Sequence, residues 1–285
     1  MKVAICVNIT REHAYDVTLA VYEELKRLGA EIFLFEEYSE FFSGLDICFK
    51  EKDEAVALCD LLISIGGDGT FIHAAHDAAK YNKNILGINA GTLGFLAGLE
   101  KQELHLLKNL VSGSFEIENR MMLCCEHYVN DVLIGKYYCL NDVVVARGLS
   151  LRLCDVAVSC DGKMMKKYYG DGVIISTPTG STAYSLSAGG PIVDPAIESI
   201  ILTPICPHSL FSRSVIFKSE SVLELKVENA ALCLPVISCD GETSIELEEG
   251  SVIKIKKSEN YSRIVRIKKD SFTDVLSKKL IEKRV

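Results

Sequence analysis

The sequence has no surplus of positive charge, no long apolar run and no paired-cysteine motif. Its 31 Lys and Arg residues are outnumbered by 39 Asp and Glu residues, which gives a formal net charge of -8. Proteins that bind nucleic acid neutralise its phosphates with an excess of Lys and Arg, so this balance argues against a nucleic-acid partner. A small-molecule ligand fits the composition better.

Apolar residues are abundant, but they never form a segment that could span a membrane. They make up 48% of the 285 residues, and charged residues make up 25%, as in soluble globular proteins. No apolar run approaches the ~20 residues that cross a bilayer. The first residues turn polar after a short apolar stretch, unlike a leader peptide. We therefore expect a cytoplasmic protein without a membrane partner.

The 11 cysteines are dispersed through apolar stretches, and none of them forms a CxxC pair. This distribution is typical of buried, reduced thiols and not of a disulfide framework. Cys124 and Cys125 are adjacent, and His73 and His76 lie three residues apart, but no third ligand accompanies either pair. We therefore assign no metal-ligating residues.

The first hundred residues alternate between two kinds of apolar segment. Residues 2–9 and 61–65 are runs rich in β-branched residues, typical of buried strands. Residues 16–28 and 71–82 instead have apolar positions at helical spacing. The alternation predicts an α/β domain over residues 1–100 with a parallel sheet, in which ligands bind at the carboxyl ends of the strands.

The character of the sequence changes after about residue 100. Short alternating runs follow, separated by turn pairs such as Asp161-Gly162, and they predict antiparallel strands from about 115 to 267. We assign residues 101–267 to this mainly antiparallel β domain. The last segment, 268–285, has helical spacing, and we expect this C-terminal helix to pack back on the first domain.

The most distinctive local motif is the glycine-rich turn Gly-Gly-Asp-Gly-Thr at residues 66–70. Gly66 and Gly67 would let a ligand approach the backbone. Gly69 permits a backbone angle closed to most residues, and Thr70 is placed to cap the following helix. Such turns bind phosphate, so we predict Gly66, Gly67 and Thr70 as phosphate-binding residues. The chain has neither a GxxxxGK[ST] loop nor a GxGxxG motif at its first strand.

Asp68 stands in the middle of this turn, where its carboxylate would repel a phosphate group. The repulsion is explained if the site transfers a phosphoryl group. In that chemistry a carboxylate positions the attacking hydroxyl and accepts its proton, while a divalent cation neutralises the phosphates. The plain alternative is a glycine-rich turn with a solvent-facing Asp.

A second polar cluster follows an apolar strand within residues 170–195. Its hydroxyl groups crowd around Pro178 and Gly180, where they would hydrogen-bond a polar ligand or line an exposed loop. Capping hydroxyls followed by small residues also predict one short helix here. The hydroxyl residues are Thr177, Thr179, Ser181, Thr182, Tyr184, Ser185 and Ser187.

Together these segments resemble the NAD kinase family, ATP-dependent enzymes that phosphorylate the adenosine ribose 2′-hydroxyl of NAD to give NADP. Diacylglycerol kinases share the GGDGT motif, so a lipid kinase is one alternative, and a non-catalytic NAD-binding regulator is another. The acidic composition and TPTGSTAYSLSAGGP at 177–191 favour an NAD kinase over a lipid kinase. The other matching segments are NAGTLGFLA at 89–97, Asn141-Asp142 and LTPICPHSL at 202–210.

The resemblance implies that the β domain of residues 101–267 binds NAD, and it implies a role for each matching residue. Asp68 is implied as the catalytic base that takes the proton from the 2′-hydroxyl. The residues implied to bind NAD are Gly69, Phe95, Asn141, Asp142, Asp171, Thr182, Ala183, Tyr184 and Ser187. The family also implies ATP as phosphoryl donor, Mg²⁺ as divalent cation, and a homodimer or homotetramer. Asp240-Gly241-Glu242 departs from the family pattern, which commonly reads Asp-Gly-Gln.

Overall fold

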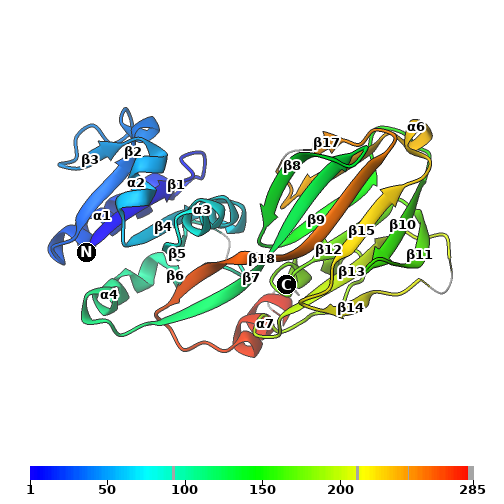
Figure 1. The fold of residues 1–285 in the computed structure, drawn as a ribbon. Helices are drawn as coiled ribbons and strands as arrows, with labels where there is room; N and C mark the ends of the chain where they lie inside the picture. The colour runs from blue at the N-terminus through cyan, green and yellow to red at the C-terminus, as the bar shows by residue number, and fades with distance from the viewer. Residues whose placement is uncertain (92–93, 210–211, 243, 282–285) are drawn as a thin grey trace. The chain divides into compact units, whose positions relative to one another are not determined.

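The computed structural model describes the chain except for residues 92–93, 210–211, 243 and 282–285 (Figure 1). It divides into two compact units, the first formed by Met1–Asn119 with Asn260–Val285 and the second by Arg120–Glu259. Residues 101–119 and 260–267, which the sequence analysis grouped with the β domain, belong by their contacts to the first unit.

The first unit is built on a parallel sheet in the order β3-β2-β1-β4-β5, with β6 and β18 also paired to β5. This confirms the predicted α/β architecture. Its elements are β1 (Lys2–Val7), α1 (Ala14–Arg27), β2 (Glu31–Phe35), η1 (Glu36–Tyr38), β3 (Cys48–Lys50), α2 (Lys52–Leu58), β4 (Leu61–Gly66), α3 (Asp68–Lys80), β5 (Asn84–Asn89), β6 (Leu99–Glu100), η2 (Lys101–Leu107) and α4 (Lys108–Ser112). The strands β7 (Glu116–Val129) and β18 (Ser251–Arg266) contribute residues to both units.

Burial explains why these segments form strands and helices. All six residues of β4 are buried, as expected for a central strand of a parallel sheet. Helix α1 buries Val17, Val21 and Leu25, which recur at helical spacing. The helix ends two residues before Gly29, which takes a left-handed φ of 72°.

The second unit is antiparallel, as predicted, with one sheet in the order β14-β13-β12-β9-β16-β17. A further antiparallel run joins β11, β10, β15 and β18, and β7 pairs with β8. The remaining elements are β8 (Val132–Cys139), β9 (Asp142–Arg147), β10 (Cys154–Cys160), β11 (Lys163–Gly170), β12 (Gly172–Ser176), η3 (Gly180–Thr182), α5 (Tyr184–Ser187), β13 (Ser199–Ile205), β14 (Val215–Lys218), β15 (Leu223–Val227), α6 (Ala230–Cys233), β16 (Pro235–Cys239) and β17 (Ser244–Glu246).

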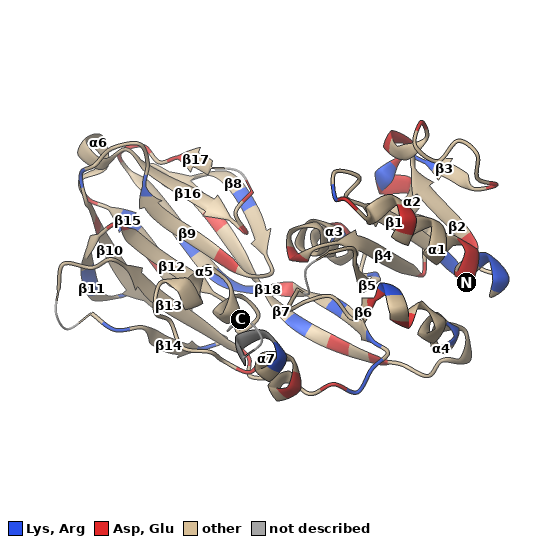
Figure 2. Cartoon of the chain, turned by 180° about the vertical axis from the view of Figure 1, so that it is seen from behind, with Lys and Arg blue, Asp and Glu red and all other residues tan. Residues whose placement is uncertain are grey.

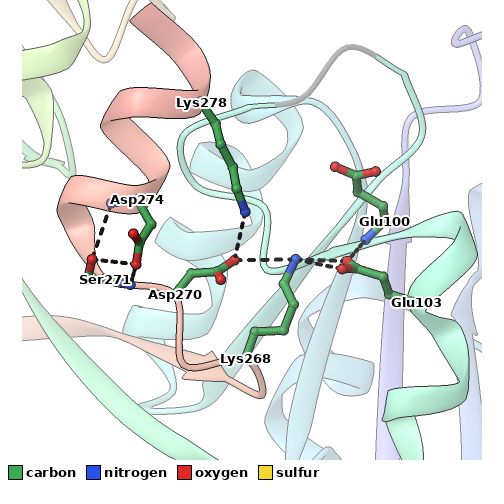
Figure 3. Close-up of polar contacts among 7 residues, drawn as sticks. All are labelled: Glu100, Glu103, Lys268, Asp270, Ser271, Asp274 and Lys278. Atoms are coloured by element: carbon green, nitrogen blue, oxygen red, sulfur yellow. Dashed lines mark hydrogen bonds and ion pairs between the residues drawn. The ribbon is translucent and has the colours of Figure 1, made fainter. Parts of the chain in front are cut away.

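The C-terminal segment belongs to the first unit, and its helix α7 (Phe272–Ile281) confirms the predicted helix. Lys268 donates hydrogen bonds of 2.8 and 3.0 Å to both carboxylate oxygens of Glu103. Asp270 lies 3.7 Å from the ammonium groups of Lys268 and Lys278, which connects α7 to the same network (Figure 3). The side chains of Leu280 and Ile281, which belong to the helical spacing of this segment, lie outside the described residues.

All 11 cysteines are free, in agreement with the predicted reduced thiols. Most are at least partly buried, but Cys48, the first residue of β3, and Cys206, the residue after β13, are exposed. In the part of the chain that the structure describes, no helix combines the length and the apolar character needed to cross a membrane.

Candidate active site

The Gly-Gly-Asp-Gly-Thr segment joins the carboxyl end of β4 to the start of α3, as the sequence predicted. Strand β4 ends at Gly66, and α3 begins at Asp68 with Gly67 as its N-cap residue. A Cβ atom on Gly66 would lie 2.4 Å from the hydroxyl of Thr70, so the tight turn requires glycine.

Two details of this turn differ from the prediction. Thr70 does not cap the helix, because α3 starts two residues before it and has no side-chain cap. Its hydroxyl instead accepts a hydrogen bond of 3.3 Å from the side-chain Nδ2 of Asn8, the residue that follows β1. Gly69 lies inside α3 and does not have a positive φ, so it is not required for a special backbone angle. Without a side-chain cap, the first turn of α3 keeps the anion-binding character of a helix N-terminus.

The carboxylate of Asp68 is held by a second glycine-containing segment of the first unit. One oxygen accepts a hydrogen bond of 2.7 Å from the Phe95 amide, and the other accepts one of 3.0 Å from the Leu96 amide. A Cβ atom on Gly94 would lie 2.0 Å from the nearer oxygen, so glycine is required there as well. Since an ionised carboxylate has about four acceptor positions, Asp68 can still accept a hydrogen bond from a substrate hydroxyl.

A pocket of about 460 Å³ opens beside this turn, within the first unit. The Nη2 atom of Arg11 would lie 3.6 Å from a Cβ atom on Gly67, so the guanidinium reaches over the turn. Guanidinium groups bind phosphate through paired hydrogen bonds. Arg11 was not predicted, because it stands alone after β1 and no motif marks it. The pocket is lined by Val7, Asn8, Ile9, Arg11, Glu37, Tyr38, Gly69, Thr70 and His73.

In the second unit, Asn141 and Asp142 lie at the start of β9, directly after Leu140. Both oxygens of the Asp240 carboxylate accept hydrogen bonds from this short segment. The amide of Leu140 donates at 2.6 Å, and the amides of Asn141 and Asp142 each donate at 2.8 Å. The role of Asp240 was missed because its partners are backbone groups, which no side-chain motif reveals.

The hydroxyl-rich loop holds the same segment from another direction. The Thr177 hydroxyl donates to the Leu140 carbonyl at 2.6 Å, and the Thr177 amide donates to the Asn141 carbonyl at 2.8 Å. A Cβ atom on Gly180 would lie 2.1 Å from that Asn141 carbonyl oxygen, so the loop approaches as closely as glycine allows. Asn141 is therefore fixed by two segments that are distant from it in the sequence.

The short helix α5 lies in this loop, and it confirms the predicted helix. The predicted hydroxyl caps are absent: no side chain caps the amino-terminal end of α5 or of η3. Thr182 and Ala183 are half-buried, whereas Tyr184 and Ser187 are exposed. Residues 172–193 contain no Asp, Glu, Lys or Arg, and Figure 2 shows α5 as an uncharged element of the second unit.

Asp142 is the most deeply buried acid of this region, with 5% of its surface exposed. Burial raises the pKa of its carboxyl to about 7, with smaller contributions from Asp240 and Cys239. Ser176 stands directly opposite Asp142 on β12, so the two side chains share one face of the sheet. The buried hydroxyl of Ser176 has no hydrogen-bond partner among the described residues. This face therefore offers both an acid and a hydroxyl for polar recognition.

Asp171 precedes β12 and forms an ion pair that the sequence did not predict. The Arg147 side chain donates a hydrogen bond of 2.6 Å to the Asp171 carboxylate. Both side chains keep about 30% of their surface exposed, so the pair lies at the surface of the unit. A ligand that binds Asp171 would have to share this carboxylate with Arg147.

The predicted site residues thus form one group in each unit. Asp68, Gly69 and the Phe95 amide come together in the first unit, around the amino-terminal end of α3. In the second unit, the Asn141-Asp142 segment lies against the start of the hydroxyl-rich loop. Binding of NAD or phosphate by any of these residues stays a prediction.

Two family models match the chain and together cover most of it. The ATP-NAD kinase N-terminal domain matches residues 3–115, and the ATP-NAD kinase C-terminal domain matches residues 140–267. An NAD kinase of Caldanaerobacter subterraneus subsp. tengcongensis is 39% identical over 285 residues, covering 99% of both chains. An NAD kinase of Natranaerobius thermophilus is 35% identical over 280 residues, covering 98% of this chain and 97% of the relative.

Two solved structures share the fold. Yeast NADH kinase complexed with NADH superposes with a TM-score of 0.89 at 25% identity, covering 100% of this chain and 88% of that chain. An NAD kinase from Archaeoglobus fulgidus in complex with ATP gives a TM-score of 0.75 at 29% identity, covering 97% and 99%. The architecture is therefore that of kinases that act on nicotinamide dinucleotides. By both of its family models and by its full-length relatives, the chain belongs to the NAD kinase family.

Proposed function

We propose that this protein transfers the terminal phosphoryl group of ATP to the adenosine ribose 2′-hydroxyl of NAD, forming NADP. Membership in the NAD kinase family makes it an ATP-dependent kinase, and relatives named NAD kinase match nearly the whole chain. One solved relative holds ATP and another holds NADH. The comparisons favour this function over a lipid kinase or a non-catalytic NAD-binding regulator.

In this proposal Asp68 is the general base. The observation that carries the assignment is the pair of hydrogen bonds from Phe95 and Leu96, which hold the carboxylate at the amino-terminal end of α3. The carboxylate accepts the proton of the 2′-hydroxyl while the 2′-oxygen forms a bond to the terminal phosphorus of ATP. The bond from that phosphorus to the bridging oxygen breaks, and ADP leaves.

We assign recognition of the dinucleotide mainly to the second unit. The side-chain amide of Asn141 can both donate and accept, and the Asp142 carboxyl matches a ribose hydroxyl or an adenine edge. The uncharged hydroxyl-rich loop suits the neutral parts of NAD. The residues proposed to bind NAD are Gly69, Phe95, Asn141, Asp142, Asp171, Thr182, Ala183, Tyr184 and Ser187.

We assign the ATP phosphates to the turn formed by Gly66, Gly67 and Thr70 and to the adjoining pocket. The guanidinium of Arg11 and the uncapped start of α3 both favour negative charge there. Among the described residues, no group of three or more His, Cys, Asp or Glu side chains could hold a metal ion. Mg²⁺ binds mainly through substrate phosphates and water in such enzymes, so it would enter with ATP and neutralise the phosphate charge.

We further propose that the protein is a cytoplasmic homodimer or homotetramer that associates through its second unit. Val132 and Ile134 on β8 are 63% and 54% exposed, which is unusual for neighbouring apolar side chains on one strand. Light scattering of the purified protein tests this assignment. A monomer at micromolar concentration would exclude it.

The activity is tested by mixing the purified protein with NAD, ATP and Mg²⁺. An NADP-specific dehydrogenase then detects the product, and diacylglycerol replaces NAD in a parallel reaction. We expect NADP to form at a rate proportional to enzyme concentration. Phosphorylation of diacylglycerol without NADP formation would contradict the proposal and favour the lipid kinase.

A further inference from the structure

Asp240, which lies outside the predicted site, is bonded directly to the backbone of the Asn141-Asp142 segment. Its carboxylate accepts from three consecutive backbone amides, those of Leu140, Asn141 and Asp142, at 2.6 to 2.8 Å. These bonds use most of the acceptor positions that a carboxylate has. The carboxylate is therefore committed to the Asn141-Asp142 segment, which the proposed function assigns to NAD.

The backbone around Asp240 keeps this carboxylate in a fixed place. Asp240 has a left-handed φ of 50° and Gly241 one of 74°, so the two residues form a tight turn between β16 and β17. The Asp240 amide also donates a hydrogen bond of 2.9 Å to the Asp142 carbonyl. The turn and the segment are thus bonded in both directions, and their relative position leaves little freedom.

We propose that Asp240 is a positioning residue for dinucleotide binding, which orients Asn141 and Asp142 through their backbone without touching NAD itself. This inference rests on the proposed function of those two residues. It deepens that function, because it assigns the orientation of the pair to a third residue about a hundred positions away in the sequence.

A purely structural turn does not explain this arrangement. Asp161-Gly162 forms a turn with nearly the same backbone, at φ values of 50° and 77°. There the carboxylate accepts one backbone hydrogen bond, of 2.9 Å from Val222, in an exposed position. Asp240 instead lies beside another acid, Asp142, where like charges oppose each other. A turn that only connects two strands would have no need of this second acid.

Asp240→Asn is the test, with Asp161→Asn as the matched control in the same kind of turn. The asparagine keeps the shape, but its NH₂ group faces backbone donors and the negative charge is lost. We expect NAD affinity, measured by calorimetry without ATP, to fall about tenfold to a hundredfold, the range for a lost hydrogen bond to a charged group. The KM for NAD should rise in parallel, while the KM for ATP stays within about twofold.

Asp161→Asn should bind NAD as the wild type does, although both variants lower the melting temperature. If Asp240→Asn binds NAD as tightly as Asp161→Asn, the inference is wrong and the proposed function stands. If the wild type forms no NADP, the proposed function fails and the inference falls with it. Should Asp240→Asn not fold, Asp240→Glu keeps the charge and displaces it by one methylene, and it should show the same selective loss of NAD affinity.

A double-mutant cycle with Asn141→Ala separates positioning from a direct contact. If Asp240 acts through Asn141, then Asp240→Asn should change NAD affinity much less in the Asn141→Ala background than in the wild type. Fully additive losses would mean that Asp240 acts on NAD independently of Asn141, which contradicts the proposal.

Discussion

In the first unit Asp68 accepts hydrogen bonds from two backbone amides, whereas in the second unit Asp240 accepts three and lies beside another acid, Asp142. Both carboxylates hold a neighbouring segment in place. Asp68 does so at a helix N-terminus next to an open pocket and the cation of Arg11. In the described part of the chain, the groups that raise the pKa of Asp142 besides burial are an acid, Asp240, and a thiol, Cys239, and the neighbouring loop is uncharged over residues 172–193.

This difference suits Asp68 to proton transfer and Asp142 to ligand recognition. A general base needs a carboxylate with acceptor capacity to spare, which the two-amide arrangement leaves to Asp68. An acid that binds a hydroxyl or an adenine edge can act in its neutral form, and the raised pKa of Asp142 favours that form. The same residue type therefore serves two purposes because its surroundings differ.

The largest expected effect comes from removing the base. Asp68→Asn keeps the size of the side chain but cannot accept the proton, so turnover should fall by a factor of about 10² to 10⁴. The NAD affinity, measured by calorimetry, should stay close to that of the wild type. Unchanged turnover would mean that Asp68 only anchors Phe95 and Leu96.

Displacing the base should lower turnover somewhat less than removing it. In Gly94→Ala the new methyl group would lie 2.0 Å from the Asp68 carboxylate and must push it aside. A shift of about 1 Å can lower turnover on the order of 10²-fold. Gly91→Ala, in the same segment, is the control, because no described heavy atom lies within 4 Å of its Cβ position. Equal turnover of the two variants would contradict this reading of the contact.

The guanidinium of Arg11 should affect the binding of ATP, the phosphoryl donor, and not the binding of NAD, the phosphoryl acceptor. Arg11→Gln removes the charge beside the turn, and we expect the KM for ATP to rise about tenfold, as for a lost charged hydrogen bond. The KM for NAD should change little. Arg27→Gln is the control, because Arg27 pairs with Glu24 on an exposed face of α1. A rise in the KM for NAD alone would contradict the assignment of Arg11 to ATP.

The remaining effect concerns stability and pH and not the reaction itself. The pKa of Asp142 rises from 3.8 to about 7 on folding, so the folded protein holds a proton that the unfolded chain releases. The stabilisation is complete below pH 3.8 and is lost as the pH rises through about 7, with a slope of at most about 1.4 kcal/mol per pH unit. Urea unfolding of Asp142→Asn should show a flatter profile between about pH 4 and about pH 7.

Asp161→Asn provides a control of opposite sign for this experiment. A backbone hydrogen bond from Val222 lowers the pKa of Asp161, so its contribution is present at neutral pH and is lost only as the pH falls into the acid range. An Asp142→Asn profile that matches the wild type between about pH 4 and about pH 7 would rule out the raised pKa.

Much of the first unit could be predicted, because its strands and helices bury residues at regular intervals. The order of β1, α1, β4 and α3 follows from that periodicity. Strand β6 could not be predicted, since its two residues are a strand only by pairing with β5. The helical turns η2 and α4, over residues 101–112, lie in a segment that was assigned to the β domain, because a change of composition near residue 100 does not fix where one unit ends.

The site was predicted less completely, for a physical reason. Asp68 and Asn141 carry recognisable side chains in recognisable motifs, so the sequence indicates them. Their partners are backbone amides of Phe95 and Leu96, or a carboxylate about a hundred residues away, and these depend on tertiary structure. Thr70 was expected to cap α3 because threonine favours that position, but the glycine pair starts the helix earlier.

Because Asp68 and Gly94 are in close contact, a substitution at either position alone disrupts the arrangement. Any side chain gained at 94 collides with the acid, and any loss of the acid leaves two amides without their acceptor. Among related genes we would therefore expect this aspartate and this glycine to be inherited together or abandoned together, even where the residues around them drift.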